Sequence, residues 1–122
     1  MENVTFYWLP NCSTCQKAKK YIERHGIREL ELRDIRENPL SREEIEKLAK
    51  MLGGAAELFS RRAIKYREMK LNERELSPAE MLDLMAVEHT FLKRPVMVMK
   101  GHAIAGYFEK FWSQFLEENY YQ

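Results

Sequence analysis

The stretch that decides the fold is VTFYWLPNCSTCQKAKKYIER, residues 4–24, which contains both cysteines of the chain. Residues 4–9 form an apolar run typical of a buried β-strand, and residues 13–24 have the periodicity of an amphipathic helix. Cys12 and Cys15 are therefore expected where a strand passes through a short turn into a helix. In that context, a C-x-x-C spacing indicates thiol redox chemistry.

The two cysteines are expected to differ in reactivity. A thiol is nucleophilic only as thiolate, which the unpaired N–H groups and the positive dipole end of a helix N-terminus stabilise. Cys12 is expected at that end, so we predict a pKa below that of a free thiol. Cys15 falls on the buried stripe of the helix, which makes Cys12 the exposed attacking sulfur and Cys15 the sheltered resolving one. The basic residues expected to help lower the pKa of Cys12 are Lys17, Lys19, Lys20 and Arg24, with only Glu23 against them.

Two other interpretations of the cysteine pair stay open. The pair could be half of a zinc site, which needs two further ligands. The nitrogen donors available are His25, His89 and His102, and none of them forms an H-x₃₋₅-H pair, so no metal is expected. The cysteines could also be unrelated to each other.

Composition narrows the class of protein. A chain of 122 residues with 45% hydrophobic and 32% charged residues is ordinary for one globular domain. A formal net charge of +1 argues against direct nucleic-acid binding. No apolar run approaches the roughly 20 residues of a membrane span, and no signal peptide is evident, so we expect a cytoplasmic protein. Nothing demands a dimer, and a monomer is expected.

The rest of the chain is expected to alternate between strands and helices. Ser41 and Ser77 each open an S-x-x-E capping box. The final helix carries an aromatic stripe that we expect to be core: Phe108, Phe111, Trp112, Phe115 and Leu116. Strands are expected over residues 27–33, 95–99 and 102–105, and helices over 41–52, 55–59, 63–69, from 77 and over 108–118. The order βαβ, helical insertion (about 40–88), ββα is similar to that of thioredoxin-like α/β folds, here a single domain over 1–122 with a four-stranded mixed sheet.

Five segments carry a more specific resemblance: NCSTC (11–15), NPLSREE (38–44), YR (66–67), LKRP (92–95) and GY (106–107). They resemble the ArsC/Spx family of thioredoxin-like proteins. That family contains glutaredoxin-coupled arsenate reductases, Spx-type transcriptional regulators and uncharacterised thiol-reductase-like proteins. The resemblance covers essentially the whole chain and is specific for the family, though not for one activity within it.

The resemblance implies roles for residues at matching positions. Cys12 matches the catalytic cysteine, and Arg94 matches an arginine that helps to hold the oxyanion in the reductases. Pro95 matches the proline that is cis in these folds and faces the cysteine loop. Residues 60–62 match a further arginine site. The implied anion- or substrate-binding residues are Arg94, Arg62, Arg61, Asn11, Ser13 and Pro95.

Two departures from the arsenate reductases bear on function. Those enzymes use a third arginine near the glycine after the last strand, where this chain has Tyr107. They also usually have one motif cysteine, whereas this chain adds Cys15, as Spx does. Both departures weaken arsenate as the substrate and strengthen an intramolecular Cys12–Cys15 disulfide.

Three functions follow as hypotheses. The first is a thiol–disulfide oxidoreductase without a bound cofactor, reset by glutathione, thioredoxin or glutaredoxin. The second is an Spx-like redox-switched regulator that binds the RNA polymerase α subunit. Against it, the sequence ends soon after its last expected helix, without the basic C-terminal extension of Spx regulators. The third is a binding domain on an idle thioredoxin-like scaffold.

Overall fold

The computed structural model describes residues 4–121, which divide into two compact units. The sheet unit contains the described residues up to Asn38 and those from Arg94 onward, and the helical unit is Pro39–Lys93. The helical insertion expected over about 40–88 thus lies inside the helical unit, which continues to Lys93. That the two units form one domain stays a prediction. Within residues 4–121, no helix combines the length and the apolar character needed to cross a membrane.

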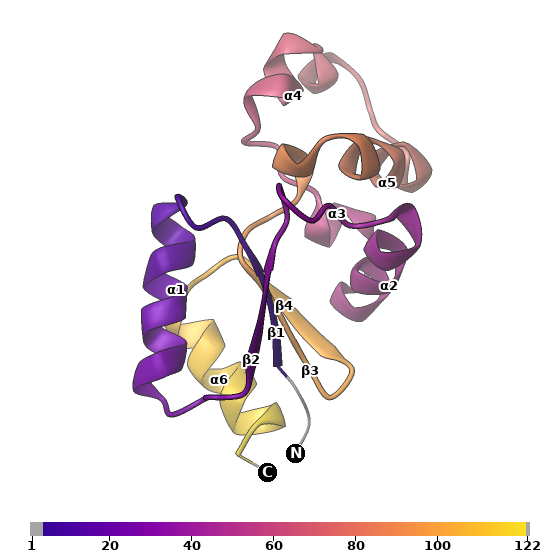
Figure 1. Cartoon of the computed structure of the whole chain (residues 1–122). Helices are drawn as coiled ribbons and strands as arrows, with labels where there is room; N and C mark the ends of the chain where they lie inside the picture. The colour runs from indigo at the N-terminus through magenta and orange to yellow at the C-terminus, as the bar shows by residue number, and fades with distance from the viewer. Residues whose placement is uncertain (1–3, 122) are drawn as a thin grey trace. The chain divides into compact units, whose positions relative to one another are not determined.

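The sheet unit is built on four strands in the order β2-β1-β3-β4. The strands are β1 (Val4–Trp8), β2 (Leu30–Asp34), β3 (Val96–Met99) and β4 (His102–Ala105). β2 runs parallel to β1, whereas the β1–β3 and β3–β4 pairs are antiparallel (Figure 1). The sheet therefore has the mixed topology expected from the sequence, and β2 and β4 are its edge strands.

Two helices, α1 (Ser13–Arg24) and α6 (Glu109–Asn119), cover the same face of this sheet. Phe6 and Met97 are directly paired across β1 and β3, and both are fully buried together with Trp112 of α6. Trp112 also donates from its indole Nε1 to the Gly106 carbonyl at 2.8 Å, so its polar atom is satisfied. α1 has the bounds that the sequence predicted.

The start of β2 differs from the expected position. The strand was expected from residue 27 but begins at Leu30. Gly26 takes a positive φ of 75°, and the Ile27 N–H donates back to the Ile22 carbonyl at 3.3 Å. Ile27 therefore closes the end of α1 and packs into the core before the strand begins.

The aromatic stripe of α6 is only partly buried. Trp112 and Leu116 are fully buried, but Phe108 and Phe111 are 66% and 55% exposed. Phe108 is the N-cap residue with an extended backbone, so its side chain is not placed by the helical repeat. Phe111 stacks edge-to-face on Phe108 at 6.1 Å instead of entering the core. The expectation that the whole stripe belongs to the core is wrong.

The helical unit consists of short helices, of which those that follow Ser41 and Ser77 begin with a side-chain cap. Both predicted capping boxes, at Ser41 and Ser77, are confirmed. Phe59 and Phe91 stack at 5.3 Å, and an antiparallel bridge joins Phe59 to Leu92. The elements are α2 (Arg42–Leu52), α3 (Ala55–Leu58), α4 (Ile64–Glu68), η1 (Leu71–Glu73), α5 (Pro78–Val87) and η2 (His89–Phe91).

Candidate active site

The cysteine loop joins β1 to α1 through a tight turn. The Cys12 N–H donates to the Leu9 carbonyl at 3.0 Å, and the side chain of Gln16 donates to the Pro10 carbonyl at 2.7 Å. Cys12 is the N-cap of α1, with an extended backbone (φ −90°, ψ 119°), and its carbonyl accepts the first helical bond from Gln16 at 3.0 Å. Cys12 therefore lies at the head of the helix, as the sequence predicted.

The N-terminus of α1 has no side-chain cap. Cys12 makes no capping hydrogen bond, and the first turn contains no acidic residue. The first N–H groups of a helix have no acceptor within the helix. Here the backbone N–H of Cys15 makes no capping bond to the Cys12 thiol but lies close enough to donate to the thiolate, which lowers the pKa of Cys12. The end of the helix thus presents its positive dipole and a donor to a thiolate.

The two sulfurs differ in burial as expected. Both cysteines are free thiols, but Cys12 is half-buried whereas Cys15 is fully buried. Their side chains lie within hydrogen-bonding reach of each other. Over residues 4–121, no third His, Cys, Asp or Glu joins them in a group that could hold a metal ion. The pair is thus an accessible thiol backed by a sheltered one.

The pKa of Cys12 is lowered, in the predicted direction. Burial opposes ionisation, but hydrogen bonds from the backbone and thiol of Cys15, together with the guanidinium of Arg94, outweigh it. The source of the positive charge differs from the expected one. Arg94 provides it, and the basic residues along α1 are not among the main contributions. Lys17, Lys20 and Arg24 are exposed to solvent, where charges are screened, and Lys19 is paired with Glu23 at 3.5 Å.

Cys15 has the opposite electrostatic environment. Burial raises its pKa to about 12, the backbone N–H of Leu9 partly offsets this, and the neighbouring Cys12 adds to the rise. Cys15 is therefore a thiol at neutral pH and can donate a hydrogen bond to the Cys12 thiolate. The structure thus shifts the pKa values of the two sulfurs in opposite directions, down for Cys12 and up for Cys15.

Arg94 and Pro95 lie immediately before β3. The Arg94–Pro95 peptide bond is cis, which confirms what the resemblance implied. The Pro95 carbonyl accepts from the Gly106 N–H at 2.8 Å. Arg94 is half-buried, and its Nε is buried without a hydrogen-bond partner among the described residues. A buried cationic donor beside a thiolate is suited to binding an anionic group.

The other predicted site residues are exposed and are not among the main contributions to the pKa shift of Cys12. Asn11 and Ser13 flank Cys12 and are exposed. Arg61 and Arg62 belong to the helical unit, are exposed, and Arg61 donates from Nη1 to the hydroxyl of Tyr66 at 2.9 Å. The structure brings Cys12, Cys15 and Arg94 together, whereas a part for Arg61 or Arg62 in anion binding stays a prediction.

Two parts of this site were missed by reasoning from the sequence. One is the backbone N–H of Leu9, which contacts the sulfur of Cys15. The other is the role of Arg94 in lowering the pKa of Cys12, since only oxyanion binding was implied for it. No residue pattern marks the first, because a backbone donor is aimed by the turn. For the second, the pairing of β3 with β1 was the missing information.

Comparisons with known proteins identify a family and several relatives of this chain. The ArsC family model matches residues 7–115. The uncharacterized protein YusI of Bacillus subtilis is 36% identical over 118 residues, covering 91% of this chain and 99% of that protein. The global transcriptional regulator Spx of Lactiplantibacillus plantarum is 28% identical over 114 residues, covering 93% and 86% respectively.

A solved structure shows the same fold. The arsenate reductase from Vibrio cholerae superimposes with a TM-score of 0.80 at 25% identity, covering 95% of this chain and 97% of that one. The mixed sheet with α1 and α6 is therefore the thioredoxin-like α/β fold of these proteins. With a family match over most of its length and a relative at 36% identity, the chain belongs to the ArsC family.

Proposed function

We propose that the protein is a thiol–disulfide oxidoreductase in which Cys12 is the nucleophile and Cys15 the resolving thiol. One observation carries the proposal: a free, half-buried Cys12 with a lowered pKa at the uncapped start of α1, in contact with Cys15 and Arg94. A thiolate with these neighbours is the reactive form of cysteine.

In the first step, the Cys12 thiolate attacks one sulfur of a substrate disulfide. The substrate S–S bond breaks, and a mixed disulfide forms between Cys12 and the attacked sulfur. The other substrate sulfur leaves as a thiolate and takes a proton from solvent. Cys12 loses its negative charge in this step.

In the second step, Cys15 gives up its proton to solvent and attacks the sulfur of Cys12. The Cys12–Cys15 bond forms, and the remaining substrate sulfur leaves as a thiolate. The substrate has then gained two electrons, which the cysteine pair has lost. The first step assists the second, because the Cys12 charge that helped to raise the pKa of Cys15 is gone.

The Cys12–Cys15 disulfide is then reduced to two thiols by a second thiol system. Glutathione, thioredoxin or glutaredoxin would supply the two electrons, and no bound cofactor is needed. An oxyanion such as arsenate is a second substrate class, because the buried Nε of Arg94 is a suitable donor for it. Tyr107 stands where the reductases are expected to have a third arginine, which favours a disulfide as substrate.

The test is an exchange assay with a small aromatic disulfide, coupled to thioredoxin or to glutathione with glutaredoxin, with arsenate as a parallel substrate. We expect Cys12→Ser to abolish exchange and Cys15→Ser to stop at the mixed disulfide, detected by intact-mass measurement. Thr14→Ala, an exposed change in the same helical turn, is the matched control and should retain exchange. Full turnover by Cys15→Ser, or a wild-type Cys12 that alkylates like a free thiol, would contradict the proposal.

A second candidate is a redox-switched regulator, favoured by the similarity to Spx and by the second cysteine within the motif. An oxidant such as peroxide would convert Cys12 to the sulfenic acid, and attack by Cys15 would release water and form the disulfide. The partner implied by the resemblance is the RNA polymerase α subunit. Association of the reduced and oxidised protein with the C-terminal domain of that subunit tests this candidate, which redox-independent or absent binding would remove.

A further inference from the structure

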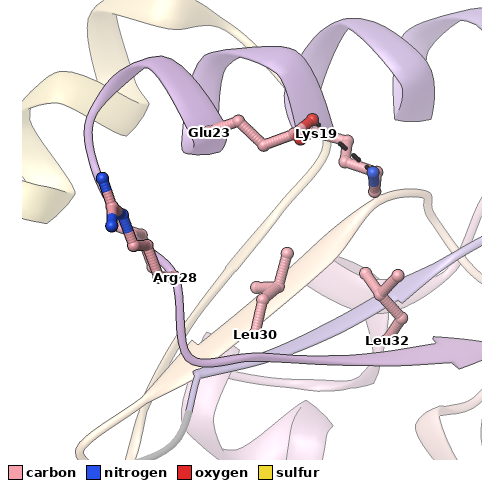
Figure 2. A pocket seen from close by; sticks show the side chains of 6 residues that line it. Lys19, Glu23, Arg28, Leu30 and Leu32 are labelled. Carbon is pink, nitrogen blue, oxygen red and sulfur yellow. Dashed lines mark ion pairs between the residues drawn. The ribbon is translucent and has the colours of Figure 1, made fainter.

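A hollow of about 420 Å³ lies between α1 and β2, and none of its lining residues belongs to the cysteine loop. In Figure 2, Leu30 and Leu32 project from β2 toward α1, where Lys19 and Glu23 form an ion pair at 3.5 Å. Leu32 is 45% exposed although it is on the helix-covered face of the sheet. The hollow thus has an apolar floor and a charged rim, formed by Lys19, Glu23, Ile27, Arg28, Leu30 and Leu32.

The hollow borders an open sheet edge. β2 ends the strand order, so its outer side pairs with no strand within residues 4–121. Odd-numbered residues make the bonds to β1, since the Glu29 carbonyl accepts from β1 and the Ile35 N–H donates to it. Backbone groups along a strand alternate between its two edges, so Leu30 and Leu32 direct theirs outward. Such an edge is a template for another strand.

We propose that this edge pairs with β2 of a second copy of the chain. The pairing is antiparallel about a two-fold axis, with Leu32 opposite Leu32 of the second copy. Residues whose backbone groups point outward then face each other, as an antiparallel hydrogen-bonded pair requires. The same patch serves on both copies, so the contact is isologous and closes as a dimer.

Charge selects this register over its neighbours. With the axis at Leu32, Glu31 lies opposite Arg33 of the second copy, and the symmetry repeats the pair. Moving the axis to Glu31 sets glutamate against glutamate, and moving it to Arg33 sets arginine against arginine. Opposite charges across a strand pair are favourable and like charges are unfavourable. Arg33 is held in position by its Nε, which donates to the Asn38 carbonyl at 3.1 Å.

The pairing would give hydrogen-bond partners to the backbone N–H and C=O groups on the outer edge of β2. It adds about six backbone hydrogen bonds along the strand. It also brings the two Leu32 side chains together beside α1, so that the apolar floors of the two hollows meet at the axis. Because a five-residue strand is a small interface, the dimer forms at high protein concentration, in place of the monomer expected from the sequence.

Charge reversal tests the register directly by sedimentation equilibrium from the micromolar to the millimolar range. Glu31→Arg alone sets arginines opposite each other and Arg33→Glu alone sets glutamates opposite each other, so both variants should lose association. An equal mixture of the two variants should regain it, because each copy then meets opposite charges. Glu43→Arg, an exposed reversal in the helical unit, should associate like the wild type. Monomeric wild type over the whole range, or a mixture no better than either variant, would overturn the proposal.

Cross-linking gives a second readout that does not depend on the redox function. In a Cys12→Ser/Cys15→Ala background, Leu32→Cys places two thiols across the axis at a Cα separation of about 5.5 Å, which a disulfide spans. Mild oxidation should give a covalent dimer faster for Leu32→Cys than for Glu31→Cys or Arg33→Cys. Val87→Cys, at an 81% exposed position, reports random collision. A Leu32→Cys rate no higher than that of Val87→Cys rejects the interface.

Discussion

The start of α1 in the sheet unit differs from the starts of α2 and α5 in the helical unit. α2 and α5 of the helical unit each begin with a serine that closes a capping box, whereas α1 begins with Cys12, which closes none. At α2, the Glu44 N–H donates to the Ser41 hydroxyl at 3.1 Å and the Glu44 carboxylate accepts from the Ser41 N–H at 2.9 Å. The first donors of α2 are thus satisfied locally. Those of α1 stay available to a sulfur.

Charge follows the same division. The first turns of α2 and α5 contain acidic residues that complement the helix dipole, and the first turn of α1 has none. A carboxylate there would repel the Cys12 thiolate and raise its pKa. The start of α1 therefore lacks the local stabilisation of the other two helices, and its unpaired backbone donors contribute to the lowered pKa of Cys12.

The largest expected effect concerns Cys15, the buried sulfur of the same turn. Burial raises its pKa from 9.0 to about 12, so the unfolded chain releases this proton at a lower pH than the folded protein does. Its contribution to stability is complete below pH 9.0 and is lost as the pH approaches about 12, by an amount on the order of a few kcal/mol. Denaturant titrations of the reduced protein across this range should show the loss.

Cys15→Ala supplies the control for that measurement. Its free energy of unfolding should fall less steeply with pH than that of the wild type, because the buried titrating group is gone. Parallel curves for the two proteins would mean that Cys15 is not sheltered from water.

The next effect tests which charge activates Cys12. Arg94→Met should raise the pKa of Cys12 and slow its alkylation at neutral pH, by about tenfold for each unit that the pKa moves. Arg94→Lys keeps the charge, so its rate of Cys12 alkylation should lie between those of the wild type and Arg94→Met. Lys20→Met removes an exposed charge of α1 and should leave the alkylation profile in place. An equal shift in Lys20→Met would show that the helix surface, and not Arg94, controls the thiol.

Local sequence patterns were sufficient to predict much of the difference between the start of α1 and the starts of α2 and α5. An S-x-x-E box closes within one helical turn, so both boxes could be read from adjacent residues, and so could the bounds of α1. The different burial of Cys12 and Cys15 also followed from helical spacing, which depends only on neighbours in the chain.

Contacts between side chains from distant parts of the chain could not be predicted from local spacing. Arg94 reaches Cys12 because β3 pairs with β1, a contact that no local spacing encodes. Phe111 shares the periodicity of Trp112, but the sheet accommodates only part of the stripe. The opposite charges of Glu31 and Arg33 were visible in the sequence. That these residues belong to an edge strand, where they could face a second copy, became evident only from the strand order.

The smallest expected effect is the contribution of a helix cap to the free energy of unfolding. Ser41→Ala removes the hydroxyl that accepts from Glu44 and should lower the free energy of unfolding by about 1 kcal/mol, without changing Cys12 alkylation. Cys12→Ala removes no capping bond, so at a pH that keeps Cys12 protonated it should change that free energy by much less. Denaturant titrations of both variants under the same conditions give the comparison. A cost for Cys12→Ala equal to that for Ser41→Ala would mean that the sulfur caps α1 after all, and that the two kinds of helix start are alike.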